Sequence, residues 1–578
     1  MPEWEELLKE SITNSERLAR NCNVVEKQEI REVIRRYPLC INKYYFNLIK
    51  EKNDPIWNQC IPHINEITDK HGLVDPLHEE EDSPVPGLTH RYPDRVLLLV
   101  SNRCAMYCRF CTRKRRVGDP FKAIFKEQTM KGIDYIREHK EVRDVVLSGG
   151  DPLLLKDERI EFILKELRKI EHVEIIRIGT KVPCTLPQRI TPELCQIISK
   201  YHPVFVNVHF NHPRELTEES KNALKMLVDA GIPVGNQTVL LRDVNDNKEV
   251  MKELTYGLMK TGVYPYYIYQ ADLTKGTDHF RTKVKDSLEI INNLRMFEAD
   301  LPTPYYIIDA PGGGGKIPLI PDYEKTNENQ EIVKIKSDED IQKLKNKDVQ
   351  VIILKSDIDD LTKIAEVRAL NKEAILVINS KIISENPEKI TQEACVELKK
   401  NTPLFINTCF NRADQINETT EKAIAMMKDN GLVLCNNTTV YKGENDNPIV
   451  IRELMHKLLK LRIKPSYIAF DSNGNSVKTK TRNCMKLIKS LRGFTSGLAV
   501  PHFAIENNGE KVIVGPNYVI DQDSDKIILQ NYAGKIYEYP EPILDESCNG
   551  NLDLINTSAS KETEIAEKQQ ATAKIGGS

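Results

Sequence analysis

Three of the thirteen cysteines in this sequence lie within eight positions. Cys104, Cys108 and Cys111 have the spacing C-x3-C-x2-C in "SNRCAMYCRFCTRKRR" (101–116), directly after the apolar run "RVLLLV". Three thiolates on one short loop can hold three irons of a cubane cluster and leave the fourth iron open. A structural zinc site needs four ligands. The pattern therefore favours an iron–sulfur cluster with an open position, although zinc or three buried thiols would also account for it.

A glycine-rich segment ending in a lysine is the second candidate site. In "IIDAPGGGGKIPLIPDY" (307–323), four glycines precede Lys316. No Ser or Thr follows the lysine, so the segment is not a Walker A loop. A lysine in such a pocket can form a Schiff base with pyridoxal phosphate. A flexible surface loop or a phosphate-binding loop would give the same local pattern.

The elements that must position these residues are short apolar runs that alternate with amphipathic helices from about residue 95 onward. This alternation predicts parallel βα units, in a full or partial barrel or in a doubly wound sheet. In either architecture, functional residues are expected in the loops that follow the strands. One such loop is the "SGGD" of "VVLSGGDPLL" (145–154), which alone indicates only a tight turn. Residues 1–75 have helix-spaced apolar positions, so the chain begins with a helical region.

The second half of the chain repeats part of the first. The segment "ITPELCQIISKYHPVFVNVHFN" (190–211) matches "ITQEACVELKKNTPLFINTCFN" (390–411) without a gap, which indicates a tandem duplication. The second copy lacks the cysteine cluster, has Cys409 opposite His209, and reduces the glycine loop to "ENNGEK", with Lys511. The hypothesis is that this copy is a structural or regulatory pseudo-repeat whose deletion leaves some activity.

The composition is that of an ordinary globular protein. The formal net charge is −3 and 29% of the residues are charged, which gives no indication of nucleic acid or an anionic membrane as a partner. The N-terminus has no apolar signal segment, and no apolar run approaches the ~18 residues of a membrane span. The odd, scattered cysteines do not form a disulfide framework, so a cytoplasmic location is expected.

Together, "DPLHEEEDSPVPGLTHRYPDRVLLLVSNRCAMYCRFCTRKRR", "LSGGDPLLL" and "DAPGGGGKIP" resemble the lysine 2,3-aminomutase family of the radical S-adenosylmethionine superfamily. The resemblance covers roughly residues 1–323 and resumes at "NYAGKIYEYPEP" near the C-terminus. It implies a partial (β/α) TIM-type barrel that holds a [4Fe–4S] cluster, S-adenosylmethionine and pyridoxal phosphate. A low-potential electron donor starts the reaction, and a 5′-deoxyadenosyl radical then drives a 1,2-shift of the amino group.

The resemblance assigns a role to individual residues. Cys104, Cys108 and Cys111 are implied to hold the cluster, and Lys316 to carry pyridoxal phosphate, with Arg91 and Arg95 as further contacts. The residues implied to line the S-adenosylmethionine site are Ser148, Gly149, Gly150, Asp151, His209, Gln237 and Tyr269. Arg113 matches the contact to the substrate carboxylate, and Asp272 and Asp309 match two carboxylates that bind the far end of the substrate.

The two aspartates favour L-lysine as the substrate and L-β-lysine as the product. The second ammonium of lysine needs acidic partners when it is buried. Arginine, which is also cationic at its far end, stays open as a substrate, whereas a glutamate mutase is expected to have neutral or cationic residues here. Two different functions also stay open: a radical S-adenosylmethionine enzyme that is not a mutase, such as a sulfur transferase, and a non-catalytic iron–sulfur protein.

The sequence departs from the family pattern in a complementary way. The family segment "RG-H/F-TSG" occurs only in the second copy, as "RGFTSG" (492–497), whereas the first copy has "RMFEADLPTP" (295–304). The chain therefore resembles one aminomutase with an extra barrel fragment inserted behind Lys316. The late cysteines that bind zinc in clostridial members are missing apart from Cys548, so zinc is not expected. Family members are homo-oligomers, but the second copy offers an internal substitute for a subunit contact, and the oligomeric state stays open.

The predicted division of the chain follows from these observations. The segments are a helical N-terminal region (1–94), a catalytic barrel (95–323), a linker (324–348), a degenerate α/β barrel-like repeat (349–518), a tail that packs on the catalytic barrel (519–545) and a disordered tail (546–578).

Overall fold

The computed structural model describes residues 3–22, 27–294, 300–320, 332–335, 337, 340–341, 344, 349–471, 481–507, 510–523 and 525–542. Residues 1–541 form one compact unit. A second unit begins at Pro542, and its other residues, including the predicted disordered tail and Cys548, lie outside the described residues. No helix among the described residues is both long and apolar enough to cross a membrane.

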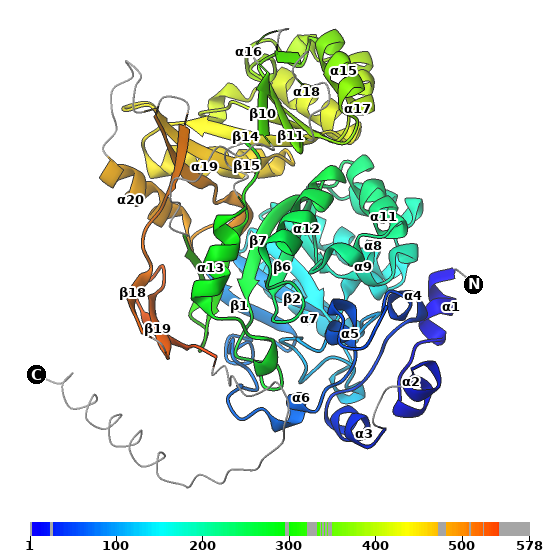
Figure 1. Cartoon of the computed structure of the whole chain (residues 1–578). Helices are drawn as coiled ribbons and strands as arrows, with labels where there is room; N and C mark the ends of the chain where they lie inside the picture. The colour runs from blue at the N-terminus through cyan, green and yellow to red at the C-terminus, as the bar shows by residue number, and fades with distance from the viewer. Residues whose placement is uncertain are drawn as a thin grey trace, which may run out of the picture. The chain divides into compact units, whose positions relative to one another are not determined.

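The first half of the chain folds into a nine-stranded sheet with its strands in sequence order (Figure 1). The strands are β1 (Leu88–Tyr92), β2 (Arg95–Ser101), β3 (Asp144–Gly149), β4 (Ile175–Thr180), β5 (Val204–Val208), β6 (Val234–Leu240), β7 (Tyr264–Gln270), β8 (Tyr305–Ala310) and β9 (Gly315–Leu319). Strands β2 to β8 are parallel, and β1 and β9 add antiparallel edges. This curled sheet is the predicted partial barrel.

Helices connect the parallel strands and cover the sheet. They are α7 (Lys126–Glu138), α8 (Asp157–Arg168), α9 (Val182–Thr185), α10 (Pro192–Ser199), α11 (Glu218–Asp229), α12 (Lys248–Lys260) and α13 (Val284–Asn292). Six short helices precede the sheet: α1 (Glu3–Lys9), α2 (Ser15–Asn21), α3 (Lys27–Arg36), α4 (Lys43–Phe46), α5 (Pro55–Cys60) and α6 (Asn65–Thr68). The region 1–94, for which a helical domain is predicted, thus contains these six helices and also β1.

The second half forms an eight-stranded sheet, also in sequence order. Its strands are β10 (Ile332–Ile335), β11 (Val351–Leu354), β12 (Ile375–Asn379), β13 (Leu404–Thr408), β14 (Val433–Thr439), β15 (Lys464–Asp471), β16 (His502–Asn507) and β17 (Glu510–Val514). Its helices are α15 (Leu361–Leu370), α16 (Ile382–Glu385), α17 (Gln392–Lys400), α18 (Glu418–Asp429), α19 (Pro448–Lys460) and α20 (Thr481–Leu491). The prediction that 324–348 is only a linker is wrong, because β10 pairs with β11 inside the second sheet.

Residues at matching positions make the same contacts in both halves. The backbone amide of Phe210 donates to Asn236 Oδ1 at 2.9 Å, and that of Phe410 donates to Asn436 Oδ1 at 2.8 Å. In each half the asparagine amide donates back to the same phenylalanine carbonyl, which fixes the loop after a strand. The contacts agree with a tandem duplication, which stays a prediction.

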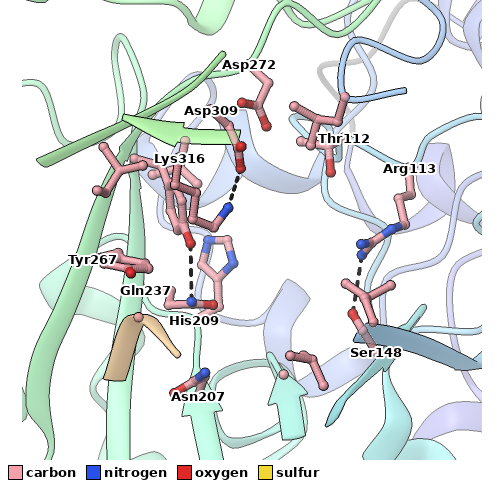
Figure 2. Close-up of a pocket in the computed structure, with 18 of the residues that line it drawn as sticks. Thr112, Arg113, Ser148, Asn207, His209, Gln237, Tyr267, Asp272, Asp309 and Lys316 are labelled. Carbon is pink, nitrogen blue, oxygen red and sulfur yellow. Dashed lines mark hydrogen bonds and ion pairs between the residues drawn. The ribbon is translucent and has the colours of Figure 1, made fainter. Parts of the chain in front are cut away.

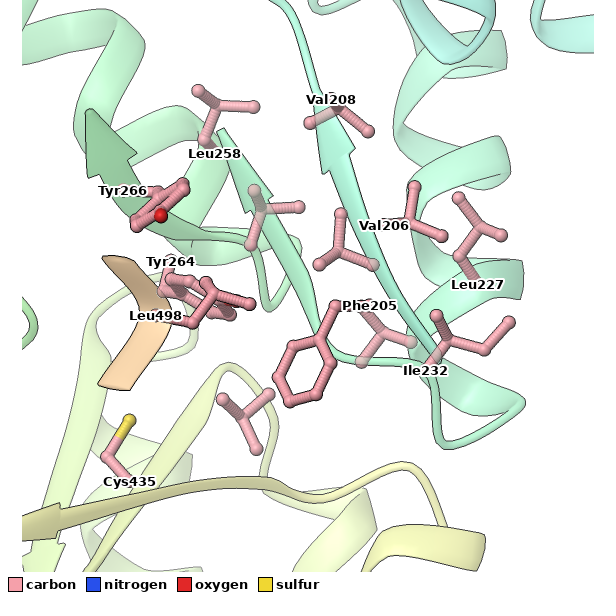
Figure 3. Close-up of a cluster of buried hydrophobic side chains, with 14 of the residues drawn as sticks. Phe205, Val206, Val208, Leu227, Ile232, Leu258, Tyr264, Tyr266, Cys435 and Leu498 are labelled. Carbon is pink, nitrogen blue, oxygen red and sulfur yellow. The ribbon is translucent and has the colours of Figure 1, made fainter. Parts of the chain in front are cut away.

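One hydrophobic core spans the two halves. Figure 3 shows Cys435 of β14 and Leu498 of the second half facing the ring of Tyr264 on β7. These three residues are almost fully buried. Because apolar burial is the main stabilising term in folding, the two halves support each other.

The end of the chain packs on the first sheet as a three-stranded sheet of β18 (Val519–Gln522), β19 (Lys526–Gln530) and β20 (Ile536–Pro540). Tyr539 Oη donates to the carbonyl of Ala271 at 3.0 Å, and Asn531 Nδ2 donates to the carbonyl of Gly314 at 3.0 Å. Ile527 and Leu529 share an apolar cluster with Ile308 of β8. The tail therefore contacts the glycine-rich loop directly.

Candidate active site

A cavity of about 450 Å³ lies where the loops that follow the parallel strands of the first sheet meet. Every residue singled out as a candidate in the sequence contributes to its lining: Arg91, Arg95, Cys104, Cys108, Cys111, Arg113, Ser148, Gly149, Gly150, Asp151, His209, Gln237, Tyr269, Asp272, Asp309 and Lys316. The carboxyl ends of parallel strands are the usual place for ligands in such sheets. The structure thus brings together residues that lie up to 225 positions apart in the sequence, from Arg91 to Lys316.

The cysteine loop follows β2 and contacts the N-terminal helices. Glu66 of α6, which is 1% exposed, accepts from Arg109 Nη2 at 2.6 Å and from Lys114 Nζ at 2.7 Å. Burial acts to raise the pKa of Glu66, but the attraction of Arg109 and Lys114 outweighs it and lowers that pKa to about 2. The buried ion triad therefore fixes the loop between Cys108 and Cys111.

The basic residues after the cysteines are thereby explained. Lys114 belongs to the triad, and Arg115 pairs with Asp75 at 2.8 Å. Arg113 pairs with Glu79 at 2.6 Å, and its Nη1 donates to Ser148 Oγ at 3.3 Å (Figure 2). Sequence reasoning missed Glu79, although the acidic run "HEEED" (78–82) that contains it complements the basic run.

The three thiols fit an iron–sulfur cluster better than a single ion. Burial raises the pKa of each of them, so the thiolate form requires a cation. Among the described residues, no three His, Cys, Asp or Glu side chains converge closely enough to hold one metal ion. A four-iron cluster does not require this convergence, since each cysteine binds its own iron.

The glycines after β3 let two loops approach each other. A Cβ on Gly149, which has φ +130°, would lie 2.0 Å from the carbonyl oxygen of Ser101, and one on Gly150 would lie 2.4 Å from that of Arg103. Asp151 is buried, and it accepts from Thr180 Oγ1 at 2.7 Å and from the amide of Lys181 at 2.7 Å. Asp151 thus joins the ends of β3 and β4 and sets the wall of the cavity.

Lys316 lies opposite Asp309 because the β8–β9 hairpin pairs these two residues directly. The intervening loop needs left-handed backbone at Gly312 (φ +69°) and Gly313 (φ +75°), which glycine adopts without strain. Lys316 Nζ donates to Asp309 Oδ2 (Figure 2). It also lies 4.8 Å from the centre of the Tyr269 ring. Burial acts to lower the pKa of Lys316, but the attraction of Asp309 outweighs it, so the amine is held protonated.

Asp272 and Asp309 form an acidic end of the cavity. Burial, and then repulsion by Asp309, raises the pKa of Asp272 far above its ordinary range. Asp309 Oδ1 is buried and has no hydrogen-bond partner among the described residues. Two buried carboxyl groups beside one lysine leave an acceptor for a second cation.

The remaining candidates have partners in the first half, and Arg95 also donates to the carbonyl of Thr495 in the second half. Gln237 Nε2 donates to Tyr269 Oη at 3.3 Å. His209 pairs with Asn211 at 3.0 Å, and burial together with the charge of Lys181 lowers its pKa to about 3, so the ring is neutral. Arg91 pairs with Asp82 at 2.7 Å. Arg95 pairs with Asp94 at 2.8 Å and stacks on Tyr92.

Part of the wall comes from the second half of the chain, which sequence reasoning did not foresee. These residues are Arg492, Gly493, Thr495, Gly497 and Val500, together with Tyr532 of the tail. Figure 2 shows the tan ribbon of this segment beside Tyr267. This lining weighs against the hypothesis that deletion of 349–518 leaves some activity, which stays a prediction. The signal was the single "RGFTSG" in the sequence.

Comparison with known proteins agrees with this geometry. The family model of the radical SAM superfamily matches residues 98–254, and that of lysine-2,3-aminomutase matches residues 488–575. The L-lysine 2,3-aminomutase of Fusobacterium nucleatum is 51% identical over 327 residues, which are 56% of this chain and 77% of the relative. That of Clostridium subterminale is 49% identical over 336 residues, 57% of this chain and 81% of the relative.

A relative with another substrate matches nearly as well. The glutamate 2,3-aminomutase of Clostridioides difficile is 47% identical over 300 residues, 52% of this chain and 71% of the relative. Membership of the radical SAM superfamily implies a [4Fe–4S] cluster and S-adenosylmethionine. The chain belongs to the lysine 2,3-aminomutase family of radical SAM isomerases.

Proposed function

We propose that this chain is an L-lysine 2,3-aminomutase, which interconverts L-lysine and L-β-lysine. The observation that carries the choice of substrate is the pair Asp272 and Asp309, with the free acceptor Asp309 Oδ1 inside the cavity. The side-chain ammonium of lysine fits this pair. A glutamate substrate would place a third carboxylate there, and like charges repel strongly in a buried site.

The residues in the cavity support three bound groups. Cys104, Cys108 and Cys111 would hold the [4Fe–4S] cluster, with S-adenosylmethionine on its open iron against Ser148, Gly149, Gly150, His209, Gln237 and Tyr269, a wall that Asp151 positions. Lys316, Arg91 and Arg95 would hold pyridoxal phosphate. When bound, the cluster and S-adenosylmethionine supply the 5′-deoxyadenosyl radical, and pyridoxal phosphate supplies a π-system that delocalises the unpaired electron.

The side chains of the cavity bind and orient the substrate. Arg113 lies across the cavity from Asp309 (Figure 2), so it suits the substrate carboxylate while the aspartates take the far ammonium. Asp309 keeps the proton on Lys316 Nζ while the amine is free.

The organisation of the chain is part of the proposal. Residues 1–94 hold the cysteine loop, 95–323 carry the site, and the second sheet with the tail closes it. Eleven of the thirteen cysteines are free thiols, which suits a cytoplasmic enzyme that receives electrons from a low-potential donor. We expect the second half to stand in for a subunit contact.

The test is an anaerobic assay of the reduced, iron-reconstituted full-length chain with S-adenosylmethionine and pyridoxal phosphate. Lysine, arginine and glutamate are supplied separately, and β-amino acids and 5′-deoxyadenosine are measured. We expect β-lysine from lysine, and no β-amino acid from glutamate. Formation of β-glutamate or β-arginine would reject the assignment of lysine, whereas 5′-deoxyadenosine without any β-amino acid would reject the mutase.

A further inference from the structure

The two halves exchange the segments that precede their last parallel strands. Arg95 Nη1 donates to the carbonyl of Thr495 at 2.7 Å, and Tyr305 Oη donates to the carbonyl of Pro501 at 2.7 Å. In the opposite direction, Tyr467 Oη donates to the carbonyl of Leu301 at 2.6 Å. The segment before β16 thus enters the first sheet, and the segment before β8 enters the second.

The entering segment fits closely against the cavity. A Cβ on Gly497 would lie 2.0 Å from Tyr267 Oη, and one on Gly493 would lie 2.2 Å from the ring of Tyr532. The short helix η9 (Gly497–Ala499) follows at once, and Leu498 is fully buried. Contacts this close fix the position of Arg492, which immediately precedes Gly493.

Arg492 is a buried cation that forms no ion pair with any described residue. It is 9% exposed, and its Nη1 is buried with no hydrogen-bond partner among the described residues. Its guanidinium lies 5.0 Å from the centre of the Tyr305 ring and 5.4 Å from that of Tyr518. No ion pair of Arg492 occurs within the described part of the chain, although the residue lines the cavity. A buried guanidinium whose Nη1 has no described partner, at the wall of a cavity, is suited to an anionic ligand.

The position of Arg492 relative to the first sheet indicates which kind of anion it can bind. Arg95 and Tyr305 are the first residues of β2 and β8, so they lie at the amino ends of these strands, whereas the cysteine loop, Asp272 and Asp309 lie at the carboxyl ends. Asp309 lies four positions after Tyr305 on β8, roughly 13 Å at 3.3 Å per residue. A ligand joined to Lys316 at one end and to Arg492 at the other must be elongated and anionic at its far end.

We infer that Arg492, from the second half, binds the phosphate group of pyridoxal phosphate in the cavity of the first half, together with Arg95. The inference rests on the proposed function, because that function places the cofactor on Lys316. Guanidinium groups are well suited to phosphate, which offers several acceptor oxygens. The second half therefore completes the cofactor site.

The experiment titrates the cofactor-free full-length chain with pyridoxal phosphate and, separately, with pyridoxal, and follows the absorbance of the bound aldehyde. The variants are Arg492→Gln, Arg492→Lys and, as a matched control, Arg452→Gln. Arg452 is half-buried on α19 and donates to the carbonyl of Ser490 at 3.0 Å, outside the cavity lining. We expect Arg492→Gln to weaken binding of pyridoxal phosphate at least tenfold and to leave that of pyridoxal unchanged. Arg492→Lys should recover part of the loss, and the control should match the unmodified chain.

Each contrary result has a distinct meaning. If Arg492→Gln weakens the binding of pyridoxal phosphate and of pyridoxal equally, or changes neither, Arg492 does not bind the phosphate. If it weakens binding of S-adenosylmethionine or of lysine instead, the anion is a carboxylate and the inference is wrong. If the unmodified chain takes up no pyridoxal phosphate, the proposed function fails as well. Circular dichroism and the melting temperature of each cofactor-free variant identify a loss of folding, and Arg492→Lys then gives the decisive comparison.

Discussion

Tyr305, the first residue of β8, stacks on His502, the first residue of β16, with ring centroids 3.7 Å apart and ring planes at 17°. His502 Nε2 also pairs with the carbonyl of Thr303 at 2.9 Å. The contact joins equivalent strands of the two sheets at the point where they exchange segments. The second half therefore contacts the first half at the candidate active site as well as through the shared hydrophobic core.

Gly497→Ala tests this close fit. The added methyl group would overlap Tyr267 Oη and Tyr266 Oη, so we expect a loss of about 1–3 kcal/mol in the free energy of unfolding and a lower rate of lysine turnover. Denaturant unfolding and the anaerobic assay give the two values. The double variant Gly497→Ala/Tyr267→Phe removes the nearer of the two overlapping oxygens and should recover part of both losses. If the single variant behaves like the unmodified chain, the segment does not pack as described.

Asp309→Asn should weaken the use of lysine. The change keeps the size of the side chain but removes the charge that faces Lys316, so we expect KM for lysine to rise at least tenfold, about 1.4 kcal/mol. The pKa of Lys316 should fall, because burial then acts without its main opposing charge. The pH dependence of cofactor uptake measures the second effect. Asp229→Asn, which removes the exposed partner of Lys399, is the control and should change neither quantity.

Asp272 should make lysine binding depend on pH. Its pKa is raised to about 8 by burial and by Asp309, so the group is largely protonated in the free enzyme at neutral pH. The ionised form binds an ammonium better, and the apparent affinity for lysine should therefore rise as the pH increases toward 8. Initial rates at several lysine concentrations between pH 6 and 8 measure this trend. Asp272→Asn should bind lysine more weakly and lose the dependence, and a dependence that persists in this variant would assign it to another group.

Much of the catalytic half could be predicted from the sequence because its signals are local. Cys104, Cys108 and Cys111 lie on one loop, so their spacing is visible in the sequence. The glycines between Asp309 and Lys316 allow the hairpin that pairs these two residues. Alternating apolar runs and amphipathic helices likewise fixed the class of the sheet. A pattern of this kind depends on neighbours along the chain, which a sequence displays directly.

The features that were missed depend on long-range contacts or on weak local preference. Arg492 enters the site only because its segment pairs with Arg95, about four hundred positions earlier. Strand β10 was missed since its four residues lie in a strongly charged stretch, and its pairing with β11 decides its conformation. Glu79 was missed because its role appears only when the acidic and basic runs meet.

Glu66→Gln should release the cysteine loop. The buried carboxylate neutralises Arg109 and Lys114, so its loss leaves two buried cations with one neutral partner, and we expect a decrease of about 3–5 kcal/mol in the free energy of unfolding at pH 7. The pKa of Glu66 is lowered to about 2 in the folded chain, so its contribution is present above its ordinary pKa and is lost as the pH falls toward 2. The difference between the variant and the unmodified chain should therefore shrink below about pH 4.5.

Iron retained by the Glu66→Gln variant after reconstitution should fall as well, because the loop that carries Cys108 and Cys111 loses its support. Glu80→Gln removes an exposed partner of Arg116 and should cost less than about 1 kcal/mol. Equal effects of the two variants would contradict a special role for the buried triad.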